Sequence, residues 1–205
     1  MKFLNFDSVL CLSPHPDDIE FSMGGSIIKH TNTYFTSIVF STGSVQDKTS
    51  NEDRWKECNN YWKNYNNIDQ HFLATLMKTY SEEEWINYIE AKFPLNQYRA
   101  LLIPSQLDTH FEHRFVHYVA MALTRVTPIT IIEYKAASAL DTWLPNTFID
   151  ISKVAEKKVK LLKKFTSQSK KYFEPEYMQA FHTHLISLKK GINTVEQFKI
   201  IAAYL

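Results

Sequence analysis

The stretch that decides the fold reads Val9-Leu10-Cys11-Leu12-Ser13-Pro14-His15-Pro16-Asp17-Asp18. Its first four residues form a short apolar run that Ser13-Pro14 interrupts, which is typical of a buried parallel strand that ends in a loop. One imidazole and two carboxylates follow at once, at the edge of the sheet where α/β proteins place their ligands. The stretch therefore has the outline of a catalytic metal site.

The loop after this strand contains donors that suit a metal ion. His15 and Asp18 are three residues apart in a tight turn with Pro16, so both can reach one ion while Asp17 stays free beside it. Pro and Asp are also ordinary turn residues, and taken alone the stretch is equally compatible with a plain turn. The pair Gly24-Gly25 lets the following helix approach the sheet closely.

A second segment of the same character favours the functional interpretation. The apolar run 100–103 ends at Pro104, and the segment 108–114, Asp-Thr-His-Phe-Glu-His-Arg, follows it. Two segments rich in histidine and carboxylates, each beyond the end of a strand, can share one crevice. His110 and His113 lie one helical turn apart in the second segment.

Apolar runs alternate with longer amphipathic stretches along the whole chain. The predicted strands cover 9–12, 35–40, 101–103 and 129–132, and the predicted helices cover 25–29, 51–64, 81–92, 114–125, 152–165 and 194–204. This alternation predicts a layered α/β fold with a mostly parallel sheet. With 205 residues and 44% hydrophobic residues, we expect one domain spanning 1–205, with an irregular loop over 135–147 that faces the same sheet edge.

The composition gives no support to several classes of protein. A net charge of +1 gives no overall attraction to nucleic acid or to an anionic membrane. No apolar run approaches the ~20 residues of a membrane span, and residues 1–7 leave no room for a signal peptide. Cys11 and Cys58 are expected to be reduced thiols, so we expect a cytoplasmic protein.

These motifs resemble the PIG-L/LmbE-like family of zinc-dependent N-acetylglucosaminyl (amino sugar) deacetylases. The segment 15–20, His-Pro-Asp-Asp-Ile-Glu, with Gly24-Gly25 looks like the opening signature of that family, and 110–113 stands at its second, HxxH-type motif. Arg54 and Glu57 match its Arg-x-x-Glu. Further similarity continues through 144–146, 148–152, Lys157 and Ser167-Gln168. The resemblance implies a three-layer, Rossmann-like fold with helices on both faces of the sheet.

The second motif departs from the usual His-Pro-Asp-His of the family. Phe111 replaces the proline, and Glu112 replaces the aspartate with a side chain of the same charge and longer reach. Glu112 could orient a histidine or tune its pKa. It could also be a solvated carboxylate that favours the positive end of the helix dipole.

The chemistry of zinc and the resemblance agree on the ligands. A catalytic zinc takes three protein ligands and keeps one position for water. His15, Asp18 and His113 supply that set, although two histidines and an aspartate can also hold iron, cobalt or manganese. The resemblance implies that Asp17 is the general base. His110 would stabilise the oxyanion or protonate the leaving amine, and we expect a carboxylate, from Asp17 or Glu112, to keep it protonated.

The resemblance further implies that Arg54 contacts the substrate, through sugar hydroxyls or a phosphate. Arg54 could equally form an exposed helical ion pair with Glu57.

Three other features have simpler interpretations. His182 and His184 are expected on a surface strand or loop, and Trp143 is expected to pack against its surroundings rather than stack on a sugar. The lysines at 153, 157, 158, 160, 163 and 164 are expected on a solvated helix face, with a phosphate-rich partner as the alternative.

The sequence thus predicts a metal-dependent hydrolase that removes an N-acyl group, most simply acetyl, from an amino sugar. The substrate would be a small glycoside, a nucleotide sugar or a glycolipid precursor. One alternative is a metallohydrolase of another small N-acyl amide. Another is a non-catalytic sugar- or nucleotide-binding module, although Asp17 beside a complete ligand set argues against a pure binder. The sequence leaves the substrate, the native metal and homo-oligomer formation open.

Overall fold

The structure is a computed structural model that describes residues 1–43, 51–73, 76–125, 127–168, 174–183 and 192–204. A seven-stranded sheet runs in the order β3-β2-β1-β4-β5-β7-β6. Its strands are β1 (Ser8–Ser13), β2 (Tyr34–Val39), β3 (Ile68–Phe72), β4 (Ala100–Pro104), β5 (Thr130–Tyr134), β6 (Thr147–Asp150) and β7 (Val195–Ala202). The five strands from β1 to β5 are all parallel: β1 pairs with β2 and β4, β2 pairs with β3, and β4 pairs with β5. β7 pairs antiparallel with both β5 and β6.

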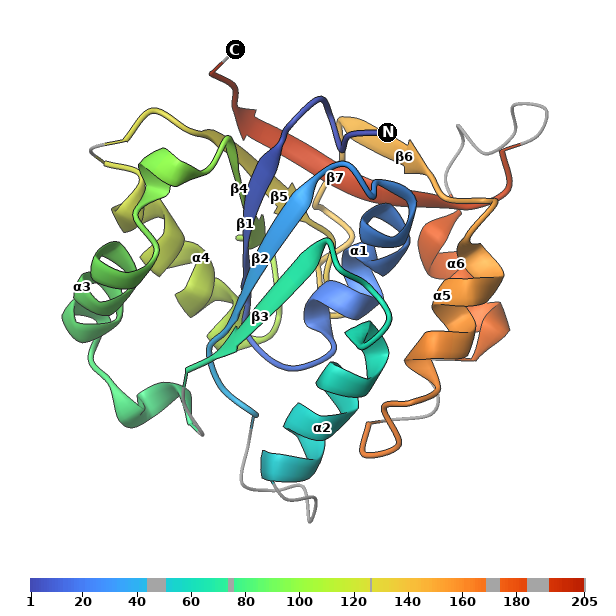
Figure 1. The fold of residues 1–205 in the computed structure, drawn as a ribbon, viewed down its shortest axis with the longest axis horizontal. Coiled ribbons are helices and arrows are strands. Elements are labelled where there is room, and N and C mark those ends of the chain that lie inside the picture. Colours follow the sequence, from blue (N-terminus) through green and yellow to red (C-terminus); the bar gives the residue numbers. More distant parts are fainter. Residues whose placement is uncertain (44–50, 74–75, 126, 169–173, 184–191, 205) are drawn as a thin grey trace.

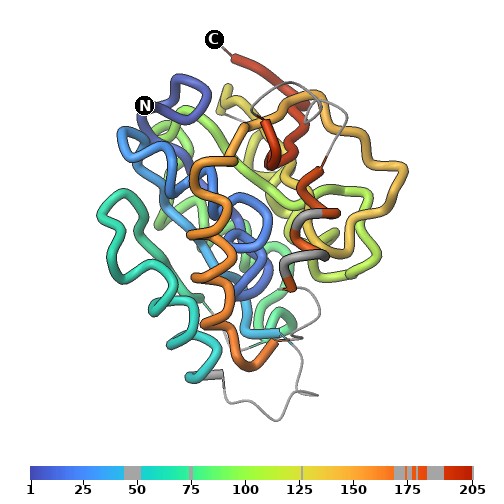
Figure 2. The backbone as a smooth tube through the Cα atoms, turned by 90° about the vertical axis from the view of Figure 1, so that its right-hand side faces the viewer, coloured from blue at the N-terminus to red at the C-terminus, as the bar shows by residue number. Residues whose placement is uncertain are grey.

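Helices cover both faces of this sheet (Figure 1). The helices are α1 (Asp18–Lys29), α2 (Asn51–Trp62), α3 (Glu82–Lys92), α4 (Phe111–Leu123), α5 (Ala155–Leu162) and α6 (Pro175–His182), with short 3-10 turns at Met77–Thr79 and Leu95–Gln97. One core lies between the sheet and α1, α2, α5 and α6, and the other lies between the sheet and α3 and α4. Figure 2 shows that the start of the chain and the end of β7 lie at the same end of the molecule.

The apolar run in β1 is continuous because the strand is buried on both faces. Val9 and Cys11 face one core, and Leu10 and Leu12 face the other. The four strands predicted from such runs are confirmed, as are the mostly parallel sheet and the layered α/β fold. The chain leaves β1 at the C-terminal edge of the sheet, and this edge carries the histidines and carboxylates of both motifs.

The predicted helix over 194–204 is wrong, because this segment forms β7. Val195 and Phe198 are buried in the sheet, where pairing with β5 and β6 satisfies the backbone. The polar residues that suggested an amphipathic helix are also buried: Gln197 donates to the carbonyl of Phe181, and Glu196 reaches α1. Tertiary pairing therefore overrides the local pattern. β3, β6 and α6 were not predicted.

An ion pair between Lys158 and Glu196 holds α1 against β7. The Glu196 carboxylate accepts hydrogen bonds from the amides of Gly25 and Ser26, at 2.8 and 2.7 Å. Lys158 Nζ lies 2.7 Å from Glu196 Oε1 and donates to the carbonyl of Phe21 on α1. A Cβ at Gly25 would lie 2.9 Å from Glu196 Oε1, so the glycine permits the close approach that the sequence predicts.

The interpretation of the basic run as a solvated helix face is wrong for Lys158, because its side chain is fully buried. Its third partner is His182 Nε2, at 2.9 Å. His182 is therefore a buried residue and not part of a surface strand or loop, and burial lowers its pKa well below the usual range. His184 lies outside the described residues. Trp143 is buried and donates to Glu133, which confirms its predicted packing role.

Removing the cation of this ion pair should destabilise the fold. Lys158→Ala is expected to lower the free energy of unfolding by about 3–5 kcal/mol, because it leaves the buried carboxylate of Glu196 uncompensated. Urea denaturation would measure this against Lys160→Ala, an exposed lysine on the same helix, which should change stability by less than about 0.5 kcal/mol. Equal stability of the two variants would show that the ion pair does not hold α1.

Candidate metal centre

The turn that follows β1 is left-handed at Asp17, where φ is 109°. The Asp17 amide donates to the carboxylate of Glu20 at 3.1 Å. Glu20 is itself buried and accepts hydrogen bonds from Cys58, Trp62 and Gln70. This arrangement starts α1 at Asp18, earlier than the predicted start at 25. It also directs the two neighbouring carboxylates to different places.

His15, Asp18 and His113 come together as the sequence predicts. Their ligand atoms all lie within 4.8 Å of one another. His15 Nδ1 is 3.3 Å from Asp18 Oδ2, and His113 Nε2 is 3.4 Å from Asp18 Oδ1. Burial alone would raise the pKa of Asp18, but the imidazoles of His113 and His15 hold this pKa well below its usual range. Two imidazole nitrogens and one carboxylate form a donor set that fits a catalytic zinc ion.

Asp108 is a supporting residue that sequence reasoning missed. Its Oδ2 lies 2.9 Å from Nδ1 of His113, which leaves Nε2 of that ring facing Asp18. A carboxylate behind a histidine ligand is the usual way in which proteins orient that ligand. Asp108 precedes His113 in the same polar segment, but its sequence context is also that of a turn residue. Ser138, from the loop 135–147, also lies near His113 Nδ1, at 3.3 Å.

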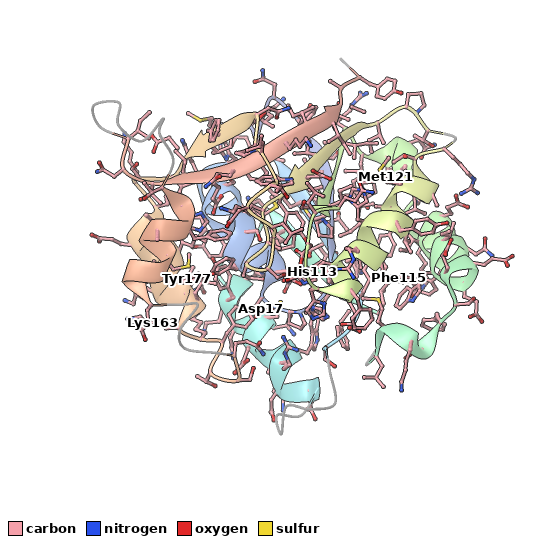
Figure 3. The ribbon with its side chains drawn as sticks, turned by 180° about the vertical axis from the view of Figure 1, so that it is seen from behind. Asp17, His113, Phe115, Met121, Lys163 and Tyr177 are labelled. Carbon is pink, nitrogen blue, oxygen red and sulfur yellow. The ribbon has the colours of Figure 1, made fainter. Side chains whose placement is uncertain are left out.

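Asp17 lies beside this group without belonging to either potential metal cluster found among the described residues. Its Oδ1 is 3.5 Å from Arg54 Nη2. Burial raises the pKa of Asp17 to about 7, against the opposing charge of Arg54, and the neighbouring Asp18 raises it further. A carboxyl group with a pKa near neutrality can both take up and return a proton. Figure 3 shows Asp17 and His113 at this edge of the sheet.

His110 is the N-cap residue of α4 and sits over the same centre. Its ring centroid is 4.9 Å from that of His15 and 4.7 Å from that of His113. The expectation of a raised pKa is wrong: burial and the charges of His15 and His113 lower the pKa of His110. His110 Nδ1 accepts a hydrogen bond from the amide of Glu112 at 3.2 Å, which leaves the proton of a neutral ring on Nε2.

Glu112 bonds His15 and not His110, the histidine expected to need a carboxylate. Its Oε2 bonds Nε2 of His15, on the opposite side of that ring from Asp18. The two histidines His15 and His110 form a second cluster of metal-binding atoms with Glu112. The longer side chain of glutamate therefore brings a carboxylate to the rim of the centre.

Arg54 is buried and its guanidinium already has protein partners. It donates to the carbonyls of Thr42 and Pro16, and Gln168, with its amide oxygen turned inward, accepts from Nε at 2.9 Å. The alternative of an exposed ion pair with Glu57 is wrong, because both residues are buried. Glu57 instead accepts from the backbone amide and hydroxyl of Ser167. Substrate specificity is also expected to depend on the loop 43–51, which lies largely outside the described residues.

A scan of protein-family models matches residues 10–124, more than half of the chain, to PIG-L, described as GlcNAc-PI de-N-acetylase. The chain belongs to the PIG-L family. The match includes both segments that carry the metal centre. A search of curated protein sequences gave no match.

Solved structures of low sequence identity share the PIG-L fold of this chain. The N,N'-diacetylchitobiose deacetylase from Pyrococcus horikoshii is 19% identical, with 97% of this chain and 85% of that chain covered and a TM-score of 0.75. The conserved protein TT1542 from Thermus thermophilus is 18% identical, with 98% and 96% covered and a TM-score of 0.75. GalB, the 4-carboxy-2-hydroxymuconate hydratase from Pseudomonas putida, is 15% identical, with 100% and 98% covered and a TM-score of 0.79. Because these structures of one fold include a deacetylase and a hydratase, the fold alone does not identify the function, which must be argued from the site.

Within the described ranges, no helix has the length and apolar character of a membrane span.

Metal binding to this PIG-L protein should become tighter as the pH rises. Burial would lower the pKa of His113, but the charges of Asp18 and Asp108 and their hydrogen bonds raise it to about 10 in the metal-free protein. An ion that binds Nε2 must displace this proton. Although burial acts against it, hydrogen bonds with Asp18 and Glu112 also raise the pKa of the second ligand, His15. The apparent zinc affinity should therefore rise at least about tenfold per pH unit between about pH 6 and pH 8. Calorimetric titration of the metal-free protein would measure this.

The matched controls are two histidine variants. His113→Ala should lose metal because one of three ligands is gone. His71→Ala should bind like the parent, since His71 lies on β3 outside both clusters. A zinc affinity that is the same at both ends of this pH range would contradict the assignment of His113 as a ligand.

Proposed function

We propose that this chain is a zinc-dependent N-deacetylase, a single domain over residues 1–205, that hydrolyses the acetamide of an amino sugar. The observation that carries the proposal is that the two adjacent aspartates in the turn after β1 lie in different places. Asp18 joins His15 and His113, while Asp17 lies beside them outside the ligand group. A deacetylase among the neighbouring structures supports it. The substrate classes are a small glycoside, a nucleotide sugar and a glycolipid precursor. The buried free thiols of Cys11 and Cys58 support a cytoplasmic location.

The residues around the centre divide the proton transfers between them. A zinc ion held by the three ligands would supply Lewis-acid activation of water and of the amide carbonyl. Asp17 would accept the proton of the attacking water and return it to the amine that leaves. His110, neutral and protonated at Nε2, would donate a hydrogen bond to the carbonyl oxygen as that oxygen becomes negative. A neutral donor performs this task without a charge placed next to the metal cation.

Arg54 and Glu112 act around this centre in our proposal. The guanidinium of Arg54 holds the Pro16 carbonyl and faces Asp17, so we assign it the task of fixing the base. The nitrogens of Arg54 already donate to protein acceptors. A direct contact of Arg54 with the substrate, which the resemblance implies, therefore stays a prediction. Glu112 would hold the ring of His15 from the side opposite Asp18.

Acetate release from a panel of N-acetylated compounds tests this function. The zinc-loaded protein is incubated with N-acetylhexosamine glycosides, nucleotide sugars and acyclic N-acetyl amides, and acetate is measured enzymatically. We expect release from at least one sugar class and loss of that release after chelation of the metal. Release only from acyclic amides would favour a metallohydrolase of other amides. Sugar binding without any release would favour a non-catalytic module.

Asp17→Asn should separate metal binding from catalysis. We expect it to keep its metal and to lose about two or more orders of magnitude in turnover, as is typical when a general base is removed. Asp7→Asn, an exposed carboxylate on the N-terminal segment, is the matched control and should turn over like the parent. The metal content of each variant is measured together with its rate. Near-normal turnover of metal-loaded Asp17→Asn would refute the role of Asp17.

A further inference from the structure

Phe111 is an apolar side chain left exposed at the rim of the metal centre. It is the first residue of α4, and 65% of its surface is exposed. Of the phenylalanines that the structure describes, it is the one that is exposed; the other exposed aromatic residues are tyrosines, whose hydroxyls can bond water. Phe111 therefore leaves a phenyl ring accessible to a ligand at the rim of the centre.

The ring of Phe111 packs against a residue that has a catalytic role in the proposed function. It stacks on His110 with 5.7 Å between the centroids and an angle of 14° between the planes. At this distance nearly parallel rings are offset, so part of the phenyl ring extends beyond the edge of the His110 ring. His110 thus contacts one part of the ring, and an aromatic surface is left exposed beside the site.

The position of this plane indicates what it can bind. His110 lies next to His15 and His113, so an amide placed at the metal centre has Phe111 one ring farther out. In an N-acetylated amino sugar, the group attached directly to the amide nitrogen is the pyranose ring. The C–H face of a pyranose is apolar and slightly positive, which complements the negative face of an aromatic ring.

We propose that Phe111 is the platform on which the pyranose ring of the substrate stacks, and that it determines the preference of this chain for cyclic amino sugars. This inference rests on the proposed deacetylase function. Phe111 stands where the His-Pro-Asp-His motif that 110–113 resembles has proline, which offers no aromatic face. Removing the ring should weaken the binding of a cyclic sugar and leave the binding of an open-chain analogue unchanged.

The test measures binding in a background that does not turn over. Zinc-loaded Asp17→Asn protein is titrated calorimetrically with the methyl glycoside of N-acetylglucosamine and with N-acetylglucosaminitol. The alditol has the same amide on an open chain, with hydroxyls at C1 and C5 where the glycoside has its methoxy group and ring oxygen. Adding Phe111→Ala should weaken binding of the glycoside about tenfold, the equivalent of one stacking contact, and should leave the alditol within about twofold. Phe111→Trp should restore or exceed the parent affinity for the glycoside.

A second exposed aromatic residue provides the matched control. Tyr118 lies two turns farther along the same face of α4, and 57% of its surface is exposed, so Tyr118→Ala should leave both affinities unchanged. Rates measured with Asp17 intact complete the test: Phe111→Ala should raise KM for the glycoside and keep kcat within about threefold. A fall in kcat at unchanged affinity would mean that Phe111 only supports His110, and would overturn the proposal.

The outcomes also separate this proposal from the function on which it rests. If the parent chain releases acetate from sugars and the added Phe111→Ala binds the glycoside as tightly as Asp17→Asn alone, the platform is refuted and the deacetylase remains. If the parent chain neither binds the glycoside nor releases acetate from any sugar, both fail. Equal weakening for the glycoside and the alditol would also contradict stacking, because the alditol has no ring face.

Discussion

The left-handed turn at Asp17 is the constraint on which the rest of the site depends. An L-residue with φ of 109° costs on the order of 1–3 kcal/mol, and this turn persists because its surroundings hold it. Glu20 bonds the Asp17 amide, and Arg54 bonds the neighbouring Pro16 carbonyl. The turn sends Asp18 toward the two histidines and leaves Asp17 outside the ligand group. Two adjacent carboxylates with opposite pKa shifts can therefore do different work.

The fold supports this turn from a distance. α1 begins at Asp18, and the Lys158–Glu196 ion pair fixes the same helix to β7 two turns later, where Gly25 removes the Cβ that would prevent the approach. The other half of the centre comes from the loop after β4, where Asp108 orients His113. The centre thus forms where the ends of neighbouring strands β1 and β4 meet, and the helices on both faces hold the two loops in place.

The central strands and both motifs could be predicted because their signals are local. A strand buried on both faces requires a continuous apolar run, as at Val9 to Leu12, and the donors follow in fixed order. The sequence-based predictions are wrong where a side chain binds partners that are distant in the chain. Lys158 resembles its exposed neighbours in sequence, and its burial depends on partners distant in the chain, above all the carboxylate of Glu196. Nothing in the sequence indicates that Glu112 turns to His15, or that burial and the charges of His15 and His113 lower the pKa of His110.

The crystal structure of the zinc-loaded protein tests the central claim most directly. The account predicts an ion bound to His15, Asp18 and His113 at about 2.0–2.2 Å. It also predicts that Asp17 keeps its positive φ and that its carboxylate stays outside the coordination sphere, close enough to accept a proton from a bound water. A zinc ion ligated by Asp17, or an Asp17 that has relaxed to negative φ with its carboxylate turned away from the ion, would contradict the account.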